Sequence, residues 1–76
     1  MEHEKINLFI DRIAHMYRQE TSMYHQLTLL EVLHHFNETV LCLGKFKCQK
    51  QYLKDTIKDL NPTYYKGYYG RKTTMV

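Results

Sequence analysis

Helix-breaking residues are almost absent from the first half of this chain, and that distribution limits the folds it can adopt. The single proline is Pro62, and the three glycines are Gly44, Gly67 and Gly70. Proline and glycine are the residues that most often interrupt regular structure. An uninterrupted stretch before residue 44 and frequent breaks after residue 61 therefore indicate helices followed by an irregular C-terminal segment.

Two helical patterns fill the stretch before Gly44. From about residue 3 to 20, apolar side chains recur at intervals of three and four, which places them on one face of a helix. They are Ile6, Phe9, Ile10, Ile13, Met16 and Tyr17. A second helix is expected to follow, because Thr21 or Ser22 can cap its first amides. Gly44 suits the left-handed residue that often ends a helix.

The helix expected between residues 22 and 43 carries two apolar stripes, about 100° apart around its axis. One stripe is Leu29, Val32, Leu33, Phe36, Val40 and Leu43, and the other is Met23, Leu27, Leu30 and Leu41. A helix with two apolar faces is expected at the centre of the fold. A chain of 76 residues offers little cover for both stripes, so the sequence is also compatible with a homodimer.

A third helix is predicted from about residue 45 to 60, because apolar residues recur there at helical spacing and Asn61-Pro62 ends the pattern. They are Phe46, Leu53, Ile57 and Leu60. The sequence thus predicts an all-α fold. It consists of a small three-helix bundle in a helical domain at 1–61, with the second helix central, and a basic aromatic tail at 62–76. A short hairpin at 39–48 is the alternative to a break between helices, because that segment begins β-branched and has Gly-Lys in its middle.

Charge is divided unevenly between the two halves. Residues 1–44 carry three basic and six acidic side chains, whereas residues 45–76 carry eight basic and two acidic ones. Within the basic half, residues 62–76 also contain four of the seven tyrosines. Such a cationic, aromatic end is typical of a contact surface for an anionic or flat partner. The candidate partner-binding residues are Lys47, Lys50, Lys54, Lys58, Tyr64, Tyr65, Lys66, Tyr68, Tyr69, Arg71 and Lys72.

Each part of this candidate surface has a plainer interpretation. The four lysines of the 45–60 helix project within about 80° of one another, which suits a phosphate backbone but also an ordinary solvated helix face. The tyrosines can serve as a contact arm, because flat rings stack on bases or on apolar surfaces. They can equally fold back over the bundle as a lid, or belong to a disordered tail.

Metal binding and catalysis are not expected. Glu31, His35, Glu38 and Cys42 lie on one side of the second helix, but one helix cannot close a tetrahedral site with residues spread over three turns. No Cys-x2-Cys or His-Glu-x-x-His spacing and no glycine-rich phosphate loop occurs. Cys42 and His35 share a helix with no third group to orient them. We therefore expect a non-enzymatic protein without a cofactor.

The favoured hypothesis is a small cytoplasmic protein that binds and regulates or inhibits a larger protein or nucleoprotein. The chain contains no apolar run of about 18 residues that would cross a membrane. Small regulators encoded by phages and mobile elements are of this type, which is an analogy of size and class. The alternative is nucleic-acid binding, either helix-turn-helix-like or non-specific, through the lysines of the 45–60 helix and the C-terminal arm.

Overall fold

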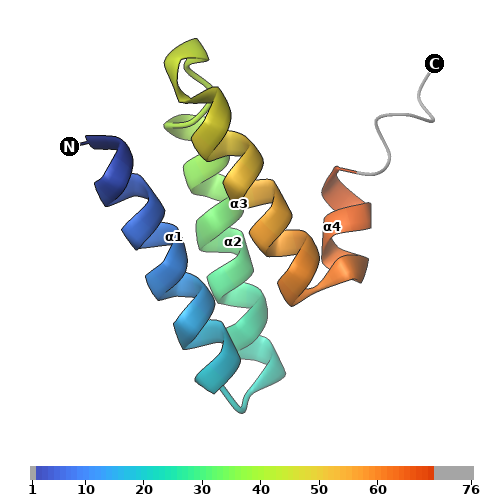
Figure 1. Cartoon of the computed structure of the whole chain (residues 1–76). Coiled ribbons are helices and arrows are strands. Elements are labelled where there is room, and N and C mark those ends of the chain that lie inside the picture. The colour runs from blue at the N-terminus through green and yellow to red at the C-terminus, as the bar shows by residue number, and fades with distance from the viewer. Residues whose placement is uncertain (1, 70–76) are drawn as a thin grey trace.

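The computed structural model describes residues 2–69, which form four α-helices and one short 3-10 helix. They are α1 (Glu2–Gln19), α2 (Met23–Thr39), η1 (Gly44–Phe46), α3 (Lys47–Leu60) and α4 (Pro62–Tyr68). The three long helices lie side by side and alternate in direction, while the short α4 lies beside the C-terminal half of α3 (Figure 1). The described residues contain no strand, so the all-α class is confirmed.

The predicted number of helices is wrong, because the start of the expected tail is the helix α4. The Oδ1 atom of Asn61 accepts a hydrogen bond from the backbone N–H of Tyr64 at 3.1 Å, which caps the first turn of α4. Pro62 occupies the first helical position, where a missing N–H costs nothing. The Asn61-Pro62 pair therefore ends α3 and begins α4.

The segment between α2 and α3 also differs from expectation. Of the two predicted capping residues, Thr21 and Ser22, it is Ser22 that caps α2, since its Oγ accepts a hydrogen bond from the N–H of His25 at 3.4 Å. The helix ends at Thr39, however, and Gly44 lies in η1 without a positive φ. The hairpin alternative at 39–48 is wrong as well. Leu41 and Phe46 are buried in this segment, and their burial overrides the β-branched local preference.

The central helix is α3, and not α2 as the sequence suggested. α3 packs extensively along both α1 and α4 and also contacts α2, whereas α2 packs mainly on α1. In α2, Leu30 and Leu33 are fully buried, but Met23 is 73% exposed and Leu27 is 41% exposed. The second apolar stripe of α2 is therefore only partly covered.

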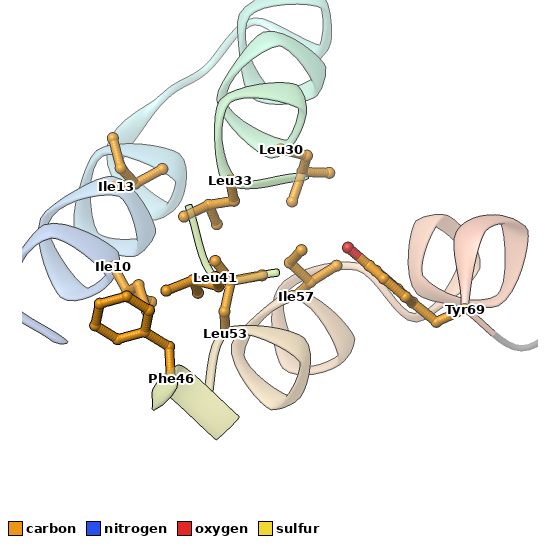
Figure 2. Close-up of a cluster of buried hydrophobic side chains, with 9 residues drawn as sticks. All are labelled: Ile10, Ile13, Leu30, Leu33, Leu41, Phe46, Leu53, Ile57 and Tyr69. Carbon is orange, nitrogen blue, oxygen red and sulfur yellow. The ribbon is translucent and has the colours of Figure 1, made fainter. Parts of the chain in front are cut away.

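The hydrophobic core draws its buried side chains from α1, α2, η1 and α3, from the segment after α2 and from Tyr69 just after α4. Figure 2 shows its nine side chains: Ile10, Ile13, Leu30, Leu33, Leu41, Phe46, Leu53, Ile57 and Tyr69. Tyr69, which follows the last residue of α4, points from that helix toward Ile57 and Leu30 (Figure 2). Residues 62–69 therefore pack on the same core as the three long helices, and the rest of the predicted tail, 70–76, lies outside the described residues.

Candidate functional site

Four tyrosines place one side of α4 against the rest of the fold. Tyr64, Tyr65, Tyr68 and Tyr69 have the spacing that brings side chains to one side of a helix. Tyr69 is only 8% exposed, and burial raises the pKa of its phenol. Its hydroxyl accepts a hydrogen bond from Asn37 Nδ2 at 3.2 Å and lies 2.9 Å from Nδ1 of His34. A phenol can donate its own proton to an unprotonated ring nitrogen, so the Tyr69 oxygen can form hydrogen bonds with both Asn37 and His34 of α2.

The other α2-facing tyrosines share a single carboxylate. The hydroxyls of Tyr64 and Tyr68 donate to Oε2 of Glu31 at 2.9 and 3.0 Å. Their rings lie 4.7 Å apart between centroids, and the Tyr68 ring lies 4.3 Å from that of His34. Burial raises the pKa of Tyr64, and the hydrogen bond to the Glu31 carboxylate raises it further. These contacts hold α4 on α2.

Two lysines of α3 cover the other side of the same aromatic group. The Nζ atom of Lys54 lies 5.5 Å from the centroid of the Tyr69 ring, and that of Lys58 lies 5.6 Å from the centroid of Tyr65. A cation at such a distance from an aromatic face is attracted by about 0.5–1 kcal/mol when the site is exposed. The structure therefore brings together lysines and tyrosines that the sequence singled out separately.

Lys47 and Lys50 have the helical spacing that places them on the same side of α3 as Lys54 and Lys58. We call the lysines of α3 the lysine ridge, and its members are Lys47, Lys50, Lys54 and Lys58. Lys66 lies exposed on α4. Within residues 2–69, Lys47, Lys50, Lys58 and Lys66 form no ion pair with a carboxylate. Arg71 and Lys72 lie outside the described residues.

The two acidic residues of α3 do not neutralise the ridge, because both have other partners. Asp59 pairs with Arg18 of α1 at 3.1 Å. Asp55 accepts a hydrogen bond from the side-chain amide of Gln51 at 2.9 Å. On α1, Asp11 likewise accepts a hydrogen bond from the Tyr52 hydroxyl. The positive charge of α3 therefore gathers on the side of the helix that faces α4.

The lid is the arrangement that the structure shows for Tyr64–Tyr69. Three of the four hydroxyls are bonded to side chains of α2, and only Tyr68 is exposed, at 45%. Sequence reasoning did not single out His34 and Asn37, the residues that receive Tyr69. The available signal was their position: both are polar residues, four positions after the apolar residues Leu30 and Leu33 of α2 respectively. The partner-binding role of the candidate residues stays a prediction.

The acidic residues of α2 do not gather into a metal site in the described part of the chain. Glu31 is engaged by two tyrosines, and no group of three or more His, Cys, Asp or Glu side chains within residues 2–69 could hold a metal ion. In the same range, no helix has the length and apolar character needed to cross a membrane.

We expect the free energy of unfolding to fall as the pH rises above about 10, the ordinary pKa of a phenol. The pKa values of Tyr52, Tyr64 and Tyr69 are all raised, for Tyr52 chiefly through its hydrogen bond to Asp11. The folded state thus holds these protons more tightly than the unfolded state does. The stability that these phenols contribute to the folded state is complete below their ordinary pKa, and it is lost as the pH rises through their pKa in the folded state.

Urea unfolding between pH 9 and about 11.5, followed by circular dichroism, measures this dependence. Tyr64→Phe should make the alkaline decline shallower. The matched control is Tyr24→Phe, which removes the same atom from a side chain that is 76% exposed. An equal decline in both variants would contradict the assignment.

Comparison of the chain with known protein families, with curated proteins and with solved structures finds no match. The chain is therefore classified by its fold alone. The chain is a small all-α protein whose short C-terminal helix α4 separates a carboxylate of α2 from a row of lysines on α3.

Proposed function

We propose that this chain is a small non-enzymatic interaction protein that regulates or inhibits a larger protein or nucleoprotein by binding an acidic surface on it. The observation that supports this proposal is the lysine ridge, together with Lys66. The four ridge lysines share one side of α3, Lys66 lies exposed on α4, and four of the five form no ion pair with a carboxylate of the described chain. Such a row attracts an anionic surface over a long range and aligns it on contact.

Contact with the tyrosine rings prepares two members of the ridge for binding. The ammonium groups of Lys54 and Lys58 lie over the rings of Tyr69 and Tyr65, so both side chains are already restricted in the free protein. A side chain that is ordered before binding loses less conformational entropy when the partner arrives. The four tyrosines then serve the site as its support, rather than as the arm that touches the partner.

The helix-turn-helix form of the nucleic-acid alternative receives little support from the geometry. In that motif the two helices cross at about 90–120° and the second one is free to enter a groove. Here α2 and α3 lie antiparallel along each other (Figure 1), and α3 is in contact with three helices. The half-buried tyrosine rings also offer little free face for stacking on bases. A protein surface rich in carboxylates is the partner that this arrangement fits better.

The proposal is tested with the full chain and two anionic probes, an oligoglutamate peptide and a DNA duplex of equal charge. We compare Lys47→Gln/Lys58→Gln with Lys5→Gln/Arg12→Gln, because both double variants remove two exposed cations and lower the net charge equally. The first should weaken oligoglutamate binding about tenfold, since exposed ion pairs contribute up to about 1 kcal/mol each. The second should leave it nearly unchanged.

Two results would overturn the proposal. If both double variants weaken peptide binding to the same degree, only the net charge matters and the ridge is no site. If the duplex binds more tightly than the peptide, with an affinity that falls steeply with salt, nucleic-acid binding takes the place of the protein partner. Fluorescence anisotropy at several salt concentrations measures both quantities.

A further inference from the structure

The surface around α4 carries charges of both signs, arranged on opposite sides of the helix. On the α2 side lie Glu31, which accepts hydrogen bonds from Tyr64 and Tyr68, and Glu38, whose charge acts on Tyr69. On the α3 side lies the lysine ridge. We call these the acidic flank (Glu31 and Glu38) and the basic flank (the lysine ridge). The two flanks and α4 together form the α4 face.

We infer that the α4 face of one copy of this chain docks on the α4 face of a second copy. A two-fold axis parallel to α4 places the acidic flank of each copy over the basic flank of the other. A two-fold axis that lies in the face but runs across α4 instead places acid over acid. Charge therefore favours one of the two face-to-face arrangements, and that arrangement is closed and isologous.

The centre of the α4 face suits close contact between two copies. Thr63 and Gly67 of α4 are both exposed, and a Cβ atom added at Gly67 would meet nothing within 4 Å. The Tyr68 ring, next to Gly67 in the chain, is 45% exposed. Small residues with a neighbouring aromatic ring allow a second helix to approach closely. The flanks then set the orientation of that helix.

The size of the chain gives a thermodynamic reason for this association. A domain of about this length buries only about 60% of the surface of its unfolded chain. Association adds buried surface and shifts the folding equilibrium by mass action. The dimer uses the same lysines as the proposed partner site, so it would compete with the partner. The inference nonetheless stands apart from the proposed function, because it concerns the purified chain alone.

A charge exchange between the two flanks tests the inference. Glu38 is near the C-terminal end of α2, and Lys50 is near the N-terminal end of α3, so both lie at the same end of this antiparallel pair. A two-fold axis parallel to α4 leaves the direction along that helix unchanged, so this end of one copy lies opposite the same end of the other copy. The variants are therefore Glu38→Lys and Lys50→Glu. Lys5→Glu on α1 is the control, because it changes the charge as Lys50→Glu does but lies outside the α4 face.

Sedimentation velocity of the purified full chain at about 50 mM salt, where screening is weak, gives the dissociation constant. The wild type and Lys5→Glu should dimerise alike, and each flank variant alone should dimerise at least about tenfold more weakly. An equimolar mixture of the two flank variants should recover the wild-type affinity, because every contact then joins opposite charges. Circular dichroism checks that each variant retains its helices.

Three outcomes would overturn the inference. One is a wild-type chain that remains monomeric at millimolar concentration. Another is a pair of flank variants that dimerise as tightly as the wild type. The last is a mixture that associates no better than either variant alone. Because no partner or polyanion is added, none of these outcomes bears on the lysine ridge as a binding site for an acidic protein.

Discussion

Replacing Leu53 with alanine should lower the free energy of unfolding by about 2–5 kcal/mol, the range observed for such a deletion in a packed core. Leu53 is fully buried and belongs to α3, the helix in contact with α1, α2 and α4. Its side chain therefore has partners on every side, and the cavity left behind cannot collapse easily. In a domain with a total stability of about 5–15 kcal/mol, this loss is a large fraction of the whole.

The matched control for this prediction is Leu8→Ala. Leu8 lies on α1 and is 54% exposed, so the control removes the same atoms from a helix but at a solvent-exposed position. We expect the control to change the free energy of unfolding by less than about 1 kcal/mol. Urea unfolding followed by circular dichroism measures both variants. Similar losses for the two would contradict the position of α3 at the centre of the core.

The central position of α3 was beyond the reach of the sequence pattern. Periodicity shows that a helix has an apolar face, but it does not show which neighbour covers that face. α2 has more apolar residues than α3, yet side chains such as Met23 remain exposed. In α3 the buried stripe is narrow and includes the polar Gln49 beside Leu53 and Ile57. Its central place follows from tertiary packing by α1 and α4, which local patterns do not encode.

The fourth helix illustrates a related limit. Asn61-Pro62 was interpreted only as the end of a helix, although asparagine at an N-cap and proline at the first position are equally typical of a beginning. With seven residues and Gly67 within it, α4 is too short to be stable by local preference alone. It is held by contacts with residues far away in sequence, chiefly those of Tyr69.

The candidate site was predictable in its composition but not in its assembly. The lysines of α3 and the tyrosines after Pro62 stood out in the sequence because of their types and spacing. Their contact depends on α4 turning back along α3, and no spacing rule predicts that turn. Glu31 was considered only as a metal ligand, and its role as the acceptor for Tyr64 and Tyr68 depends on the same turn.

Tyr69→Phe should lower the free energy of unfolding by about 1–3 kcal/mol, the usual cost of leaving buried polar groups without a partner. The change removes the one oxygen that lies within hydrogen-bonding distance of both Asn37 Nδ2 and His34 Nδ1. Asn37 is only 2% exposed, and its Oδ1 atom already has no hydrogen-bond partner within the described residues. Without the phenol oxygen, the whole amide is buried and unpaired.

A second substitution separates the cost of the unpaired amide from the loss of packing. Tyr69→Phe combined with Asn37→Leu should recover much of the lost stability, because a branched apolar side chain then replaces the buried amide and only the half-buried ring nitrogen of His34 lacks its partner. The control is Tyr24→Phe, where the side chain is 76% exposed and the expected change is within about 0.5 kcal/mol. If Tyr69→Phe costs no more than this control, the hydrogen bonds of Tyr69 do not hold α4 in place, and the tyrosines lose their role as the support of the lysine ridge.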